Sequence, residues 1–158
     1  MFRMAAPIGF SAKQLKAWHM RREGLTLNEI GGRLGVTKQA IFKALKETES
    51  KILNTLETTA KAANIAPRHI DVSKGILLGF SYETGESVVV TFSTRHGPHI
   101  WHHGSRRCDG CGLYGECMKL ILDEAKERGI ELNEAERANS PADIAREVFS
   151  RVLPGVEP

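Results

Sequence analysis

The stretch GLTLNEIGGRLGVTKQAIFKAL, residues 24–45, decides how the N-terminal part of this chain folds. Thr26 and Glu29 stand three residues apart as in a capping box, so a helix should begin directly after Thr26. Gly35 predicts a turn that needs a positive φ, and Thr37 is placed to cap the helix that follows. The stretch therefore predicts a short helix, a tight turn and another helix.

The helix that begins after Thr37 is expected to be unusually long. No strong helix breaker follows before Pro67, so this helix should run to about residue 63, unless it bends near residues 48–50. Its apolar stripe consists of Ile41, Leu45, Ile52, Leu56 and Ala63. Two interpretations stay open for Ile52, Leu53 and Leu56: they pack on a second part of the same chain, or they form a homodimer contact.

A helix is also expected before residue 24. Ser11 and Gln14 form another capping box, and Leu15 and Trp18 follow at helical spacing. Three helices separated by tight glycine turns are the layout of a trihelical helix-turn-helix unit.

The third helix of this unit should present polar side chains on its outward face. Gln can hydrogen-bond adenine edges, and Lys can reach guanine or phosphate. Phe42 either contacts a thymine methyl group or packs inward. The candidate DNA-binding residues are Lys38, Gln39, Phe42, Lys43 and Lys46, with Arg33 of the preceding helix.

The stretch from Gly24 to Ile41 resembles the helix-turn-helix of sigma-factor region four, of response-regulator output domains and of the archaeal Tfx-like regulators. The resemblance covers about residues 10–50. It implies a transcriptional regulator of archaeal or bacterial origin that binds double-stranded DNA, and most such regulators bind as homodimers. Gly31 and Gly32 depart from these families, which usually have Ala followed by a charged residue. Each glycine costs its helix about 1 kcal/mol relative to Ala.

Charge is distributed unevenly along the chain. Residues 1–68 hold 12 Lys/Arg and 5 Asp/Glu, whereas residues 69–158 hold 10 Lys/Arg and 14 Asp/Glu. A basic half joined to an acidic half indicates that the first half meets a polyanion. No stretch approaches the roughly 20 apolar residues of a membrane span, and the N-terminus has no apolar run typical of a secretory signal. We therefore expect a cytoplasmic protein with no membrane partner.

After Pro67 the sequence changes to strand-like alternation. The expected elements are strands at about residues 75–82, 87–93 and 99–103 and helices at about residues 114–129 and 141–153. The first two strands should form a hairpin, and the third should follow a turn at Gly97 and Pro98. The last helix has Ser140 as its cap and Pro141 at its first position.

All three cysteines lie in CDGCGLYGEC, residues 108–117, and four of the six histidines lie just upstream. Thiolate and imidazole are ligands that zinc favours, and C-x2-C-x5-C supplies three of the four that a tetrahedral site needs. His103 is the histidine nearest to Cys108 in sequence and is the first choice for the fourth ligand. His99 and His102 are substitutes. The predicted metal ligands are thus Cys108, Cys111, Cys117 and His103.

Other interpretations of the cysteine segment stay open. With Tyr114 between its last two cysteines, it resembles the C-terminal cysteine group of iron–sulfur nucleases found in CRISPR systems and recombination helicase complexes. In those proteins a distant fourth cysteine completes a four-iron cluster. This chain has no fourth cysteine, which favours zinc over an iron–sulfur cluster. The segment could also contain a redox-sensing thiol beside Arg106 and Arg107, a Cys–His catalytic pair, or cysteines without metal.

Together these features predict an α+β protein in two parts. Residues 1–66 form the helix-turn-helix domain with its long connecting helix. Residues 67–158 form a domain with a small antiparallel sheet, two helices and a metal loop. The predicted function is that of a sequence-specific transcriptional regulator, not an enzyme, whose metal is structural or sensory. The alternative is a metal-dependent, nuclease-like hydrolase that its helix-turn-helix directs to DNA.

Overall fold

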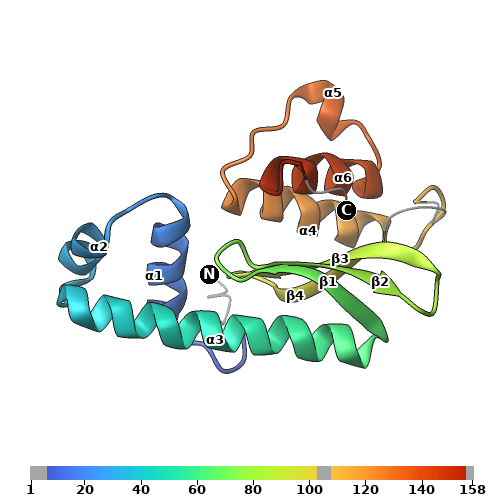
Figure 1. Cartoon of the computed structure of the whole chain (residues 1–158). Coiled ribbons are helices and arrows are strands. Elements are labelled where there is room, and N and C mark those ends of the chain that lie inside the picture. The colour runs from blue at the N-terminus through green and yellow to red at the C-terminus, as the bar shows by residue number, and fades with distance from the viewer. Residues whose placement is uncertain (1–6, 103–107, 156–158) are drawn as a thin grey trace.

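The computed structural model describes residues 7–102 and 108–155, and its fold is α+β, as the sequence predicts (Figure 1). The described residues form six helices and one four-stranded antiparallel sheet. The helices are α1 (Ala12–Arg22), α2 (Leu27–Leu34), α3 (Lys38–Ala62), α4 (Tyr114–Glu127), α5 (Glu134–Arg137) and α6 (Pro141–Val152). The strands are β1 (Ile65–Asp71), β2 (Ile76–Ser81), β3 (Glu86–Ser93) and β4 (Gly97–His102).

The three N-terminal helices begin at the caps that the sequence predicts. The Ser11 hydroxyl accepts a hydrogen bond from the backbone N–H of Gln14, and the Gln14 side chain accepts one from the Ser11 N–H, so the capping box is complete. Thr26 and Glu29 form the same arrangement at the start of α2. Thr37 caps α3 through the N–H of Ala40. Between α2 and α3 Gly35 has a φ of 68°, the left-handed conformation that glycine adopts at little cost.

Helix α3 is continuous over 25 residues. It has no break near residues 48–50, where the Thr48 hydroxyl donates a hydrogen bond back to the carbonyl of Ala44. Ile52 and Leu56 are fully buried in the chain's own core, against one face of the sheet. The homodimer interpretation is therefore wrong for these two residues, because they have no surface left for a partner, whereas Leu53 is half-buried and its role in a contact stays a prediction.

The strand order is β1-β2-β3-β4, with every neighbouring pair antiparallel. The β2–β3 hairpin confirms the prediction. Strand β1 was not predicted, because Pro67 is a poor strand residue; it is tolerated here because β1 is an edge strand with a bulge between Pro67 and His69. The expected turn at Gly97 and Pro98 is wrong, since β4 already starts at Gly97 and the chain turns at residues 94–96.

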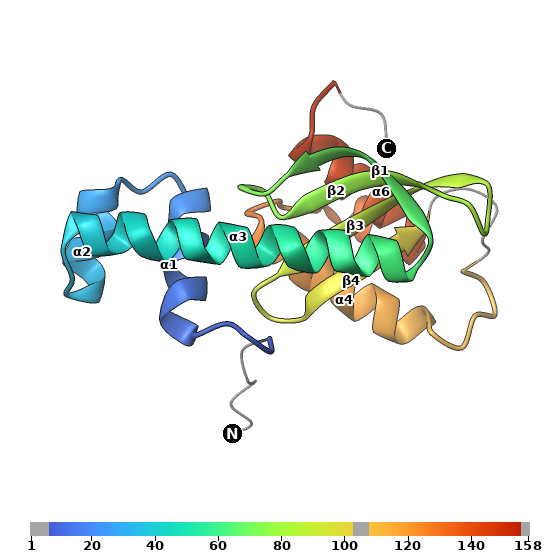
Figure 2. The same cartoon turned by 60° about the horizontal axis from the view of Figure 1, so that its bottom comes forward.

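The sheet is covered on both faces (Figures 1 and 2). Helices α1 and α3 pack on one face and helices α4 and α6 on the other, and the single turn α5 lies in the connection from α4 to α6. The first core joins buried side chains of α1, α2 and α3 to Leu77, Val88, Val90 and Phe92 of the sheet. The second joins Ile76, Leu78, Val89 and Trp101 to α4 and α6. The first core thus continues across residue 66, where the sequence suggested a domain boundary.

The two adjacent glycines of α2 lie in different surroundings, and this yields a stability prediction. A Cβ on Gly31 would come within 2.7 Å of the Val36 carbonyl oxygen, whereas a Cβ on Gly32 would meet nothing within 4 Å. We expect Gly31→Ala to lower the free energy of unfolding by about 1–3 kcal/mol. Gly32→Ala should raise it by about 0.5–1 kcal/mol, because Ala is the better helix former. Urea denaturation followed by circular dichroism measures both; a stabilised Gly31→Ala variant would contradict the close approach of α2 to the turn.

Candidate functional site

The N-terminal third of α3 combines one anchored side with one exposed side. Ile41 and Leu45 are buried and pack in the core that α1 and α2 share with α3. Seen along the helix, Lys38, Phe42 and Lys46 follow at steps of four residues, so they form one row that flanks the buried stripe. Gln39 and Lys43 form the neighbouring row. All five are exposed, as is Arg33 of α2.

Phe42 is 51% exposed, so the interpretation that it packs inward is wrong. The ammonium group of Lys46 lies 4.8 Å from the centre of its ring, a cation–π contact that holds both side chains on the surface. Among the described residues neither Lys38 nor Lys43 forms an ion pair with a carboxylate. We call the surface formed by Lys38, Gln39, Phe42, Lys43 and Lys46 the α3 face. It offers two uncompensated cations, Lys38 and Lys43, beside the planar amide of Gln39 and the exposed ring of Phe42.

The cysteine segment leads into α4. A turn at residues 108–111 is closed by a hydrogen bond from the Cys111 N–H to the Cys108 carbonyl, 3.0 Å. Cys117 lies in the first turns of α4, whose cap position, Leu113, provides no side-chain hydrogen bond. The segment that carries Cys108 and Cys111 thus leads directly into the N-terminal, positive end of the α4 dipole.

The three thiols interact electrostatically. Burial is the main cause that raises the pKa of Cys117, and the neighbouring Cys111 and Cys108 raise it further, as expected for like charges close together. Still, no group of three His, Cys, Asp or Glu side chains within residues 7–102 and 108–155 lies close enough to hold a metal ion. A shared ion would have to draw the thiols together.

The histidines are divided between different surroundings. His103, the first choice for the fourth ligand, lies outside the described residues. His99 packs against Trp101, with 4.3 Å between ring centroids. Burial lowers the pKa of His99, which favours the neutral imidazole that a metal ligand must be. His96 is bound 2.7 Å from the Asp123 carboxylate on α4.

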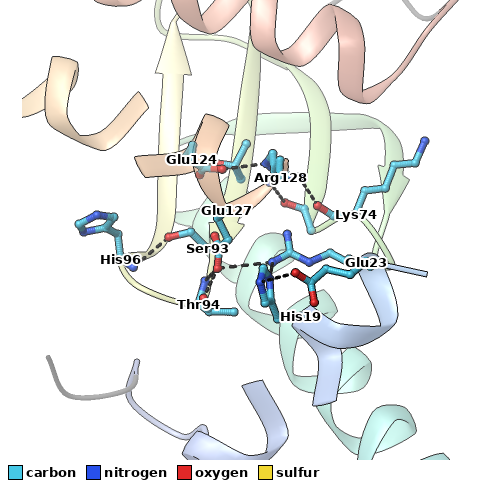
Figure 3. A network of polar contacts seen from close by, with 12 residues as sticks. His19, Glu23, Lys74, Ser93, Thr94, His96, Glu124, Glu127 and Arg128 are labelled. Atoms are coloured by element: carbon cyan, nitrogen blue, oxygen red, sulfur yellow. Dashed lines mark hydrogen bonds and ion pairs between the residues drawn. The ribbon is translucent and has the colours of Figure 1, made fainter. Parts of the chain in front are cut away.

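Sequence reasoning missed a polar network where α1, the sheet and α4 meet (Figure 3). Glu124 and Arg128 form a buried ion pair of 2.8 Å on α4. Glu127 accepts hydrogen bonds from the N–H and hydroxyl of Thr94, and its carboxylate lies 3.4 Å from the guanidinium of Arg22 on α1. Only the four-residue spacing of Glu124 and Arg128 is visible in the sequence, because the other partners are distant along the chain.

Comparisons with protein-family models, with curated proteins and with solved structures each find no match to this chain. In the part of the chain that the structure describes, no helix is both long and apolar enough to cross a membrane. Functional inference therefore depends on the surfaces and side chains described above.

Proposed function

We propose that this chain is a sequence-specific transcriptional regulator that binds double-stranded DNA through the α3 face. Its main support is the exposure of all five α3 residues on a helix that the buried Ile41 and Leu45 anchor in the core. A helix held in this way can lie in the major groove, which is wide enough to admit one. The excess of Lys and Arg in residues 1–68 adds a long-range attraction to the polyanion.

Four side chains of the α3 face, together with Arg33 of α2, have suitable roles in this proposal. Gln39 can form a bidentate contact with an adenine edge, and Phe42 can contact a thymine methyl group. Lys38 and Lys43 can reach guanine or phosphate, and Arg33 on α2 can bind the backbone beside the groove. In this proposal the lysine and arginine charges position the helix on the DNA. The amide of Gln39 and the ring of Phe42 distinguish base sequences.

The double variant Lys38→Ala/Lys43→Ala tests the DNA-binding proposal. We expect affinity for duplex DNA to fall by at least roughly tenfold, and the slope of log affinity against log salt to decrease by about 2, because two cations leave the interface. Fluorescence anisotropy at several salt concentrations measures both quantities. The matched control is Lys61→Ala/Lys119→Ala, which removes two exposed lysines outside the α3 face. Equal effects of the two double variants would contradict the proposed interface.

Sequence specificity has its own test. Selection from a pool of random duplexes should enrich one motif with the wild-type protein, and Gln39→Ala should relax the preference at an adenine in that motif. If the pool stays random after selection, the proposal of a sequence-specific regulator is contradicted. That result would not contradict DNA binding without sequence preference.

The cysteine segment is proposed to hold zinc, with a structural or sensory role. Support comes from the C-x2-C-x5-C spacing, the turn that brings Cys111 back to Cys108, and the position of Cys117 in the first turns of α4, directly after that segment. His103 is the proposed fourth ligand, with His99 and His102 as substitutes. A closed four-ligand site fits a regulator without enzymatic activity, whereas an open site with bound water would favour the hydrolase alternative.

Metal analysis of freshly purified protein distinguishes the candidates. We expect a colourless preparation with one zinc ion per chain, and Cys111→Ser should lose that ion. Iron content together with visible absorbance would contradict the zinc site and support an iron–sulfur cluster. A protein free of both metals would contradict the metal site altogether.

We further propose that the regulator acts as a homodimer, since two copies can read two half-sites. The buried stripe of α3 cannot provide the contact, so the sheet edges β1 and β4 are the candidate interfaces. Light scattering in the presence and absence of a selected duplex tests this proposal. A monomer under both conditions would contradict it.

A further inference from the structure

A cavity of about 780 Å³ lies where three helices end beside the sheet. It is lined by the last residues of α1, by the β1–β2 turn at Ser73 and Lys74, and by the C-terminal ends of α4 and α6. Figure 3 labels several of the polar lining residues, namely His19, Glu23, Lys74, Glu127 and Arg128. Such a volume is typical of a small-molecule site.

The charged lining of this cavity is predominantly basic. The basic residues are Arg21, Arg22, Lys74, Lys126, Arg128 and Arg151, with His19; the acidic residues are Glu23, Glu49 and Glu127. The C-terminal ends of α1, α4 and α6 each add a partial charge of about −0.5. Of the basic residues, Lys74, Arg128 and Arg151 are paired with carboxylates that lie outside the lining: Asp71, Glu124, and Glu136 with Glu147. Attraction for an anion therefore depends on the lining cations that have no such partner.

Two of these cations are available to a ligand. Arg21 and Lys126 are exposed, and in the described ranges neither forms an ion pair with a carboxylate. Arg21 uses one nitrogen to bind the Leu25 carbonyl, 2.9 Å, and this contact holds its side chain at the cavity. The two residues belong to α1 and α4, so a ligand with two anionic groups can contact both helices.

Arg22 adds a buried charge that its surroundings compensate poorly. Its side chain is 13% exposed, and its guanidinium lies 3.8 Å from the centre of the Trp18 ring. Its Nε and Nη1 have no hydrogen-bond acceptor within the described part of the chain, and its carboxylate partner, Glu127, is shared with Thr94. Burial lowers the pKa of Arg22 to about 10. Negative charge placed in the cavity would therefore stabilise Arg22 through space.

We propose that this cavity binds a small molecule with two or more phosphate or carboxylate groups. Arg21 of α1 and Lys126 of α4 contact its anionic groups, and Arg22 contributes its buried charge. The bound molecule links α1 to α4, and so connects the N-terminal helices to the C-terminal ones. This site is separate from the α3 face, and its existence does not depend on DNA binding.

Isothermal titration with pyrophosphate and with citrate tests the site. We expect one molecule of at least one probe to bind per chain, and Arg21→Gln/Lys126→Gln to weaken binding by about tenfold or more, because both ionic contacts are lost. The probe that binds more tightly identifies phosphate or carboxylate as the preferred group. Lys61→Gln/Lys119→Gln removes the same charge outside the cavity and should bind like the wild type.

Three results would overturn this site: no binding of either probe at millimolar concentration, unchanged binding by the cavity variant, or equal weakening in both double variants. Circular dichroism and thermal unfolding verify that both variants fold, which their exposed positions favour. All three results leave the Lys38 and Lys43 experiment unaffected, so failure of this site is distinguishable from failure of the DNA-binding proposal.

Discussion

Replacing Arg128 by Met should lower the free energy of unfolding by about 3–5 kcal/mol, because it leaves the buried carboxylate of Glu124 without its counterion. The two side chains are only 5% and 3% exposed, and Arg128 Nε donates to Glu124 at 2.8 Å. The same guanidinium also donates to the backbone carbonyls of Lys74 and Gly75, which would lose a donor. Urea denaturation followed by circular dichroism gives the change.

The matched control is Arg146→Met, which breaks the 3.3 Å ion pair between Arg146 and Asp143. Both of these side chains are about half exposed. Its cost should stay below about 1 kcal/mol. Adding Glu124→Gln to Arg128→Met should recover part of the loss, since a neutral amide replaces the isolated charge while Thr91 can still donate to its oxygen. If Arg128→Met cost no more than Arg146→Met, the burial of this pair would contribute nothing to stability.

The parts of the fold that the sequence predicts are those specified by neighbouring residues. Ser11, Thr26 and Thr37 each cap a helix through a partner three residues away, so their roles can be identified before any tertiary structure is known. Strand β1 is different. Its formation depends on pairing with β2 and on its edge position, which tolerates Pro67, and neither can be seen in the local sequence.

The candidate sites divide in the same way. The α3 face can be predicted from helical spacing once the buried positions are known. For Phe42 the sequence left two orientations open, inward or exposed, and the structure has it exposed. The cavity could not be predicted, because it depends on where α1, α4 and α6 end relative to one another. Arg22 and Glu127 are more than 100 residues apart, and only the fold brings them to 3.4 Å.

Trp18→Ala should cost about 3–5 kcal/mol, because it removes the largest side chain that joins the N-terminal helices to the sheet. Trp18 is 1% exposed and packs edge-on against Phe92 of β3, with 5.7 Å between ring centroids. The fit is tight: a Cβ on Gly75 would come within 2.8 Å of the Trp18 ring. Phe42→Ala is the control for losing an aromatic side chain, and its cost should be small because Phe42 is 51% exposed.

The same Trp18→Ala variant tests whether the two halves of the chain unfold together. Trp101 is then the only tryptophan left, and it reports on the core beneath α6, on the other face of the sheet. Because the first core crosses residue 66, we expect Trp101 fluorescence and helical circular dichroism to change together, at a urea concentration below that of the wild type. A Trp101 transition that stays at the wild-type midpoint while helix is lost first would instead make residues 1–66 an independently unfolding domain. In that case the contact between Trp18 and the sheet would stabilise only the N-terminal helices, and the long α3 would serve as a connector rather than as part of a common core.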